Sequence, residues 1–581
     1  MEQRAQVKKR PPTTLLTLPP EILSKILSCL VDENENKPDI QAVLRTCKHL
    51  HEIGLPISVS VFRNTRKSYS GSSTCSRVRN IRFIRYILVR KPWLAKHVKT
   101  VIIGRFSVYD AKYASFNHRG EGQDRVTNGE LSIYREEIEF FLGQLPSGYT
   151  QSWCRQWLTD LKSGTSDAQF SLILLCCPNI RKLSYTEPEG TRHFGQLLRF
   201  VRNLVAMNIA IQTPGSEWGD GNHPQMAIPL SNVRDVFHET PNYKNGYKNF
   251  YLEAPDLLAF PRIRFYECIL ANGPDVAGKM FKTLPYRSSS VEEIVLHCSY
   301  LCPEAMAGMV GACKALKKFE FTFARLEISP DLMTPHDILE ALLPHADTLE
   351  ELYIHLEDNG DKDWDWFERP SKLYLGSGLH QLHNLKKLTV GMQALTGMLA
   401  FQPEVLDEIQ GEIHGAIQGA IPEETEEELE DEIPPMPMEI EGAARIVESL
   451  PENLEHLLVR DCGVAIICQV EELLSVIEQG GRFKKLTDIR LIFNAWRMDM
   501  EVDGPEIEKL NSISTNVQLD IILQNDLGYI YDLGFSITED DEYATERNIM
   551  SRINSGLVRD RYLESRGTVG EVDEIPPRLL D

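Results

Sequence analysis

The sequence predicts an α/β chain in which a small N-terminal module of three helices precedes an irregular solenoid of parallel strands with outer helices. Three observations carry this prediction. Residues 14–62 show helical apolar spacing after a proline-rich start, and a short apolar template recurs beyond residue 95. The 581 residues also have the apolar and charged fractions of an ordinary soluble protein, 42% and 25%.

The first helix of the N-terminal module begins at Leu18-Pro19-Pro20-Glu21. Proline is tolerated in the first helical turn, and Glu21 places negative charge at the positive end of the helix dipole. Apolar residues then follow on one side of a 3.6-residue helix: Ile22, Leu23, Ile26, Leu27 and Leu30.

A second helical stripe follows the polar loop at residues 31–39 and consists of Ile40, Val43, Leu44, Cys47 and Leu50. The third piece runs from His51 to Phe62, and we expect Gly54 and Pro56 to break helical structure there. Periodicity alone leaves a second interpretation open, in which these residues form a small helical hairpin that caps a larger domain.

The series Leu-Pro-x-Glu-Ile-Leu, then Ile-Leu and Leu on the same helix, then Arg45, Cys47 and Lys48 on the next, resembles an F-box. This module attaches substrate receptors to the Skp-family adaptor of Skp-cullin-F-box ubiquitin ligases. The resemblance implies that apolar residues of the first two helices contact the adaptor, namely Leu18, Pro19, Ile22, Leu23, Ile26, Leu27, Leu30, Val43, Leu44 and Cys47.

Residues 63–95 are expected to form a basic linker and a helix. From Arg63 to Arg105 the chain holds twelve Lys or Arg and no Asp or Glu, although its formal net charge is −22. Apolar residues at helical spacing indicate the helix: Val78, Ile81, Ile84, Ile87 and Leu88. Such a cluster could neutralise phosphates, but no recognition motif or aromatic platform accompanies it. We therefore favour a solvated helix face over a nucleic-acid surface.

Beyond residue 95 one template recurs, with apolar residues at its first, fourth and sixth positions. The copies are Val98-Val101-Ile103, Ile180-Leu183-Tyr185, Leu204-Met207-Ile209, Val291-Ile294-Leu296, Leu316-Phe319-Phe321, Leu349-Leu352-Ile354, Leu385-Leu388-Val390, Leu454-Leu457-Val459 and Leu486-Ile489-Leu491. Consecutive copies lie about 24 to 36 residues apart, which is the scale of a leucine-rich repeat. Each copy would supply a short strand and a return helix.

The alternative is an ordinary α/β domain, because a three-position template is loose. Recurring charged pairs favour the repeat: Glu292-Glu293, Lys317-Lys318, Glu350-Glu351 and Lys386-Lys387. A repeat buries the apolar residues of its strands, among them Leu352, Ile354, Leu388, Val390, Leu457 and Val459. Residues 104–179 and 210–290 are expected to be long insertions with degenerate or absent copies.

Irregular repeats behind an F-box resemble the large F-box families of filamentous fungi, in which the solenoid holds the substrate. The expected order is a flexible N-terminus (1–13), the F-box (14–62), the basic linker and helix (63–95), the first part of the solenoid (96–402), an acidic insertion (403–441), the last part of the solenoid (442–555) and a flexible tail (556–581). Residues 403–441 contain fourteen Asp or Glu and no Lys or Arg, so we expect this insertion to be disordered and solvated.

Several classes of protein are disfavoured. No apolar run approaches the roughly 20 residues that span a bilayer, and the start lacks the apolar core of a secretion signal. The twelve cysteines lack companion ligands at zinc-site spacing, which suits reduced core residues in the cytoplasm or nucleus. Phosphate-binding loops, nucleophile elbows and HExxH are missing, and we expect structural roles for His297, His355 and His456 beside the repeat strands. We predict no enzyme activity, no metal and no cofactor.

The function predicted from these features is substrate recognition in a Skp-cullin-F-box ubiquitin ligase. The F-box would bind the adaptor and, through it, cullin, while the concave face of the solenoid would bind a protein substrate. Catalysis in such a ligase resides in other subunits. Two alternatives stay open: a non-catalytic scaffold or binding protein that acts outside a ligase, and an enzyme whose site is unrecognised.

Overall fold

The computed structural model describes residues 15–31, 37–64, 74–104, 126–143, 150–186, 191–212, 228–239, 253–269, 271–273, 275–323, 333–355, 374–375, 377–397, 445–463, 466–494, 517–524 and 530–532. The predictions for residues 1–13, 403–441 and 556–581 lie outside these ranges. The chain divides into two compact units. Unit 1 comprises Met1–Pro241, Ala259–Ile263 and Asp560–Asp581, and unit 2 comprises Asn242–Leu258 and Arg264–Arg559.

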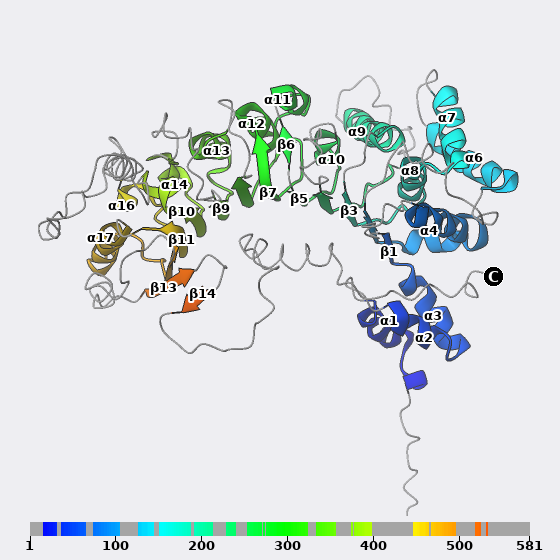
Figure 1. Ribbon diagram of the computed structural model, residues 1–581, viewed down its shortest axis with the longest axis horizontal. Helices are drawn as coiled ribbons and strands as arrows, with labels where there is room; N and C mark the ends of the chain where they lie inside the picture. The colour runs from blue at the N-terminus through cyan, green and yellow to red at the C-terminus, as the bar shows by residue number, and fades with distance from the viewer. Residues whose placement is uncertain are drawn as a thin grey trace, which may run out of the picture. The chain divides into compact units, whose positions relative to one another are not determined.

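Unit 1 begins with the predicted helical module, but the second predicted stripe, Ile40 to Leu50, is divided between two helices. The module consists of a 3-10 turn, η1 (Leu15–Thr17), and three helices, α1 (Pro20–Cys29), α2 (Lys37–Leu44) and α3 (Lys48–Ser58) (Figure 1). The prediction that Gly54 and Pro56 break the third helix is wrong, because α3 runs through both. A Cβ on Gly54 would lie 2.5 Å from Leu44 Cδ2 and 3.2 Å from Leu27 Cδ1. Glycine therefore allows α3 to pack closely against α1 and α2.

In its described ranges the rest of unit 1 contains four parallel strands and further helices. The strands pair in chain order: β1 (Val61–Asn64), β2 (Thr100–Ile103), β3 (Lys182–Thr186) and β4 (Asp235–Glu239). The helices are α4 (Thr74–Ile84), the π-helix η2 (Arg85–Arg90), the 3-10 helix η3 (Pro92–His97), α6 (Asn128–Leu142), α7 (Thr150–Ser163), α8 (Ser166–Cys176) and α9 (His193–Gln212). The helix predicted in the basic segment is confirmed, and Ile81, Ile84 and Ile87 are buried.

Unit 2 continues the same pattern. Each of the following strands is parallel to the next: β5 (Phe265–Ile269), β7 (Glu293–Leu301), β8 (Lys318–Phe323), β9 (Glu351–His355), β10 (Lys387–Gly391), β11 (His456–Cys462), β12 (Asp488–Asn494) and β13 (Gln518–Gln524). Two short strands complete the set: β6 (Asn272–Gly273), which pairs with β7, and β14 (Ile530–Asp532), which is antiparallel to β13.

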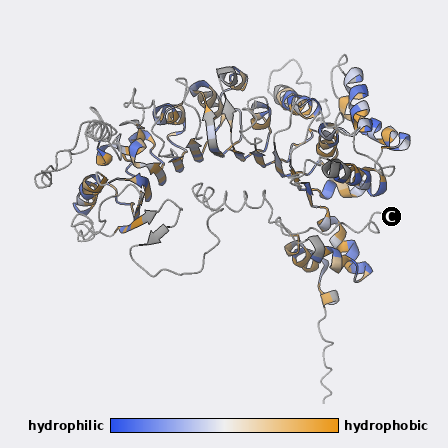
Figure 2. Cartoon of the chain, in the orientation of Figure 1, coloured by the Kyte–Doolittle hydropathy of each residue, from blue (hydrophilic) through white to orange (hydrophobic). Residues whose placement is uncertain are grey.

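Helical segments connect the strands of unit 2. They are α10 (Ala254–Leu258), α11 (Asp275–Phe281), α12 (Pro303–Ala312), α13 (Pro335–Leu342), η6 (Leu343–His345), η9 (Ser377–Gln381), α14 (Met392–Thr396), α16 (Ile446–Ser449) and α17 (Ile466–Glu478). Helices such as α12 and α13 lie on one side of the strands (Figure 1). The helices carry hydrophobic and hydrophilic residues in alternation, as expected for elements with one covered face (Figure 2). The predicted α/β solenoid of parallel strands and outer helices is confirmed.

The template residues form the core between strands and helices. All six apolar side chains predicted to be buried are at most 2% exposed: Leu352, Ile354, Leu388, Val390, Leu457 and Val459. Leu388 is the register partner of both Leu352 and Leu457, so equivalent positions of successive repeats stack on one another. Side chains alternate along a strand, and the intervening residues therefore point away from the helices. We call that surface the strand face.

One predicted copy is wrong, and among the described residues the parallel strands β1, β4, β5 and β13 were not among the predicted copies. Leu204-Met207-Ile209 lies within helix α9 and forms no strand. Strands β4 and β5 fall inside residues 210–290, where an insertion with degenerate or absent copies was expected, and the copies there are degenerate: Val233-Val236-His238 and Ile263-Tyr266-Cys268. The other predicted insertion, residues 104–179, contains helices α6, α7 and α8.

Candidate binding surfaces

The N-terminal module leaves large apolar side chains uncovered. On α1, Ile22 is 42% and Ile26 is 40% exposed, and Leu15, just before the helix, is 47% exposed. Ile22 and Ile26 are four residues apart, so they lie next to each other on one helix face. Exposed apolar side chains that are grouped in this way are typical of a protein-binding surface.

The other residues predicted to contact an adaptor divide into two groups. Some are exposed or half-buried: Leu18, Pro19, Leu30, Val43 and Cys47. The remaining three, Leu23, Leu27 and Leu44, are only 1%, 2% and 8% exposed and form the inside of the module. The accessible apolar surface of α1 is thus the outer half of the predicted stripe.

Alternating charges run across neighbouring strands of unit 2. The predicted charged pairs become register neighbours there, in the order Glu292-Glu293, Lys317-Lys318, Glu350-Glu351 and Lys386-Lys387. Lys317 Nζ lies 2.9 Å from Glu292 Oε2, and Lys386 Nζ lies 2.6 Å from Glu350 Oε2. The hydrogen bond from Lys386 lowers the pKa of Glu350. Each strand thus carries the opposite charge of its neighbour.

The equivalent position in unit 1 is uniformly basic. Lys99, Arg181 and Arg234 each lie just before a strand, and their backbones are linked: Arg181 N donates to Lys99 O and Arg234 N donates to Arg181 O, both at 2.7 Å. All three side chains are exposed. In the described ranges none of them is ion-paired, so this edge of unit 1 is positively charged.

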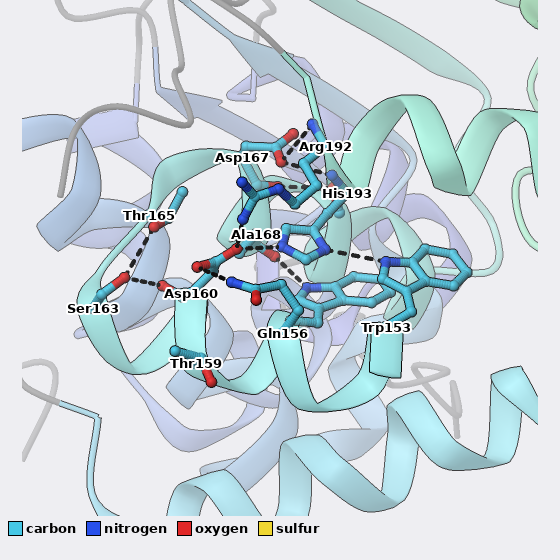
Figure 3. A network of polar contacts seen from close by, with 12 residues as sticks. Trp153, Gln156, Thr159, Asp160, Ser163, Thr165, Asp167, Ala168, Arg192 and His193 are labelled. Atoms are coloured by element: carbon cyan, nitrogen blue, oxygen red, sulfur yellow. Dashed lines mark hydrogen bonds and ion pairs between the residues drawn. The ribbon is translucent and has the colours of Figure 1, made fainter. Parts of the chain in front are cut away.

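Unit 1 also contains a buried polar network, drawn in Figure 3, that joins α7, α8 and the start of α9. His193 is fully buried, and its Nε2 lies 2.8 Å from Asp160 Oδ2. Trp153 Nε1 donates to Nδ1 of the same ring at 3.2 Å. Arg192 Nη1 adds a second contact to Asp160 Oδ2 at 3.0 Å.

Asp167 completes the network from α8. Its carboxylate accepts three backbone N–H groups at the start of α9, from Arg192 at 3.2 Å, His193 at 2.7 Å and Phe194 at 3.1 Å. Burial raises the pKa of Asp167 and lowers that of His193. Both ring nitrogens of His193 are already engaged, which leaves neither free to act as a base. The network therefore anchors α9 and carries no catalytic geometry.

In the part of the chain that the structure describes, no three His, Cys, Asp or Glu side chains are grouped so that they could hold a metal ion. Burial raises the pKa of the Cys313 thiol to about 12. None of the helices described combines the length and the apolar character that crossing a membrane requires.

Sequence reasoning missed a polar group on the strand face of unit 2. Arg460 is 4% exposed and lies in β11, next to Asp461. The available signal was the pair of charged residues Arg460-Asp461 directly after the apolar run Leu457–Val459, with Arg460 at a position where the template expects a strand-face side chain. His355, which was expected to be structural, contacts Asp461 across β10.

Comparison with known families identifies the repeats. The family model described as "Leucine-rich repeat domain" matches residues 74–393, which is more than half of the chain. The match begins after the N-terminal helical module and covers strands β2 to β10. No curated protein matches the chain in sequence.

Proposed function

Because the chain belongs to the leucine-rich repeat domain family, whose domains are typically non-catalytic scaffolds for protein interaction, we propose that it is the substrate-recognition subunit of a Skp-cullin-F-box ubiquitin ligase. In this proposal α1 to α3 form the F-box, which binds a Skp-family adaptor and through it cullin. The repeats bind a protein substrate. The function implies a location in the cytoplasm or the nucleus.

The observation that carries the proposal is the uncovered apolar face of α1. Ile22 and Ile26 are each about two-fifths exposed, although Leu23 and Leu27 on the same helix are buried. Covering the exposed part of each would contribute roughly 1–1.5 kcal/mol to association. Interfaces concentrate their energy in a few such central side chains.

The experiment is adaptor capture by a variant of this face. We expect Ile22→Glu with Ile26→Glu to abolish co-purification of the Skp-family adaptor and of cullin, because a charge would be buried at the centre of the contact. The matched control is Phe140→Glu on α6, where the side chain is 73% exposed and lies outside the module. Melting of the repeats should be unchanged in both variants. Adaptor capture by the double variant at wild-type affinity would refute the F-box assignment.

The strand face of unit 2 is the proposed substrate surface. Its alternating charges leave Lys387 about half exposed and Arg490 46% exposed at the side-chain level, so polar groups are accessible to a partner. A scaffold that acts outside a ligase remains the second candidate. Cullin distinguishes the two, because a ligase receptor should bring cullin together with the adaptor, whereas a scaffold should bring the adaptor alone or neither.

A further inference from the structure

Three neighbouring strands of unit 2 bring a polar group together on the strand face. Gly391 on β10 is the register partner of Arg460 on β11, and continuation of the β9–β10 register places His355 on its other side. Gly391 has no side chain, and among the described residues that are not its chain neighbours, a Cβ there would meet only Asp461 Oδ2 within 4 Å, at 3.8 Å. The glycine therefore leaves space above β10, between the side chains of β9 and β11.

Arg460 and Asp461 lie in a β-bulge. The pairing of β11 with β12 shifts register between Val459 and Cys462, and Asp461 has a φ of 51°, in the left-handed region. That conformation costs free energy for a residue with a Cβ, although Asp adopts it more readily than most, and strained backbone of this kind clusters at functional sites. Asp461 Oδ2 lies 3.0 Å from His355 Nε2, so this carboxylate is bound across the space above Gly391. Bulges of this kind re-aim side chains next to binding sites.

Arg460 is a buried cation without an ion pair. It is 4% exposed, its Nε has no hydrogen-bond partner, and in the part of the chain that the structure describes no carboxylate lies within ion-pairing distance of it. Asp461 is already bonded to His355, and Glu320 Oε2 lies 3.4 Å from Lys318 Nζ. Burying a charge without a counter-charge opposes folding. The site therefore keeps a guanidinium in place at a cost to stability.

The neighbouring hydroxyl is also suited to an anion. Burial raises the pKa of Tyr353 to about 12, an effect that Arg460 opposes, so the phenol stays protonated and can donate a hydrogen bond. A guanidinium and a phenol beside it offer several N–H and O–H donors. Carboxylate and phosphate groups accept such donors strongly, and the flat fork of Arg fits them in a bidentate manner.

We propose that Arg460, with Tyr353 beside it, is an anion-binding site on the strand face of unit 2 that receives a carboxylate or phosphate group of the bound partner. This inference rests on the proposed use of the strand face for substrate binding, and it names an anionic group as part of what is recognised. The guanidinium would bind the anion, Tyr353 would donate a hydrogen bond to it, and the His355–Asp461 bond would hold the bulge that aims Arg460.

The first experiment measures thermal unfolding of the full chain at constant ionic strength, with chloride exchanged for inorganic phosphate or for acetate. We expect the melting temperature of the wild type to rise and to saturate with phosphate, acetate or both. In Arg460→Met the half-saturating concentration should increase roughly tenfold or more, and Arg460→Lys should respond in between. Arg490→Met is the matched control, because Arg490 lies on the same face but is ion-paired with Asp488 and Asp520 at 3.3 Å.

The melting temperature without added anion separates a binding role from a structural one. If Arg460 awaits a ligand, Met at this position should leave the melting temperature unchanged or raise it, since an unpaired buried charge is removed. A clear fall in Arg460→Met would show that the guanidinium stabilises the fold and would overturn the proposal. An equal anion response in the wild type and in Arg460→Met would overturn it too.

Short peptides of one sequence, with Asn, Asp or phosphoserine at the centre, identify the source of the anion. Arg460-dependent binding of the phosphoserine or Asp peptide over the Asn peptide supports an anionic side chain of a protein partner. A response to phosphate without discrimination among peptides supports a free anion. Adaptor capture by Arg460→Met should equal that of the wild type. Loss of the ligase assignment would therefore leave the anion-binding result valid, and loss of the anion site would leave the ligase assignment valid.

Discussion

Asp167→Ala removes the acceptor for the first turn of α9, and its effect can be worked out from the structure. The carboxylate accepts the N–H groups of Arg192, His193 and Phe194, and Asp167 is fully buried. Arg192 is exposed, so water can replace its lost acceptor. His193 and Phe194 are fully buried, so their two N–H groups would be left without a partner.

A buried donor without a partner costs about 1–3 kcal/mol, which gives roughly 2–6 kcal/mol for two. Part of this cost is offset, because the variant no longer has to desolvate the charged form of a carboxylate whose pKa is raised by burial. We therefore expect Asp167→Ala to destabilise unit 1 by about 2–4 kcal/mol. Asp167→Asn keeps one acceptor oxygen and should cost less.

Denaturant unfolding followed by circular dichroism measures the free energy, and hydrogen exchange reports the amides of His193 and Phe194 directly. Asp160→Asn is the control, because Asp160 binds the side chains of His193 and Arg192 and accepts none of these three backbone N–H groups. A loss below about 0.5 kcal/mol in Asp167→Ala, or unchanged protection of the two amides, would refute the anchoring role.

Three further predictions concern the repeats. Leu388→Ala, in a 1% exposed core position, should lower the free energy of unfolding by about 2–5 kcal/mol in urea titration, whereas Thr389→Ala on the strand face should cost far less. Burial lowers the pKa of His238 from 6.5 to about 3, so the contribution of the neutral ring to the free energy of unfolding is complete above pH 6.5 and is lost as the pH falls. Between pH 8 and pH 5 this loss is about 2 kcal/mol, and His238→Phe should remove that pH difference from the unfolding curves. Lys386→Glu would place a carboxylate between Glu350 and Glu455, so it should lower the melting temperature more than Lys484→Glu does. Added salt should reduce the difference in melting temperature between the two variants. Equal melting temperatures would contradict a role for the alternating charges.

The sequence predicted the repeats where the template residues are aliphatic, Phe or Tyr, because such strands have no other way to bury their side chains. It failed at β4 and β5, where the last template position holds His238 and Cys268. His238 occupies its core position by stacking on Tyr185, with ring centroids 4.6 Å apart and planes at 20°. In the sequence alone, a titratable residue at a core position interrupts the apolar pattern, because its stacking partner on the next strand is known only from the fold.

The false copy at Leu204-Met207-Ile209 has the opposite cause. Apolar residues at the first, fourth and sixth positions also fit a helix, and the preceding residues Phe194, Leu197 and Val201 extend a helical stripe that is buried in α9. Met207 is 36% exposed, which a core strand position would not be. Length decides between the two structures: the helical pattern continues over several turns, whereas a strand of a repeat ends after about five residues.

On α1 the sequence identified the apolar stripe but could not tell which of its side chains are exposed and which are buried. Ile22 and Leu23 are adjacent in sequence and have the same character, yet one is 42% and the other 1% exposed. Which of them faces α3 depends on the close approach that Gly54 permits, and that is a property of the packed module. The Arg460 site was hidden for a similar reason, because a β-bulge and the space above Gly391 arise only once β9, β10 and β11 are paired.

The charged pairs contain more information than their number suggests. In unit 2 they alternate in sign from repeat to repeat, so pairing each strand with its neighbour in sequence places Glu beside Lys, whereas skipping one repeat would place Glu beside Glu or Lys beside Lys. The alternation therefore favours the observed strand order. Lys99, Arg181 and Arg234 occupy the same position in unit 1 and repel one another, so strand order there has to be set by the apolar core.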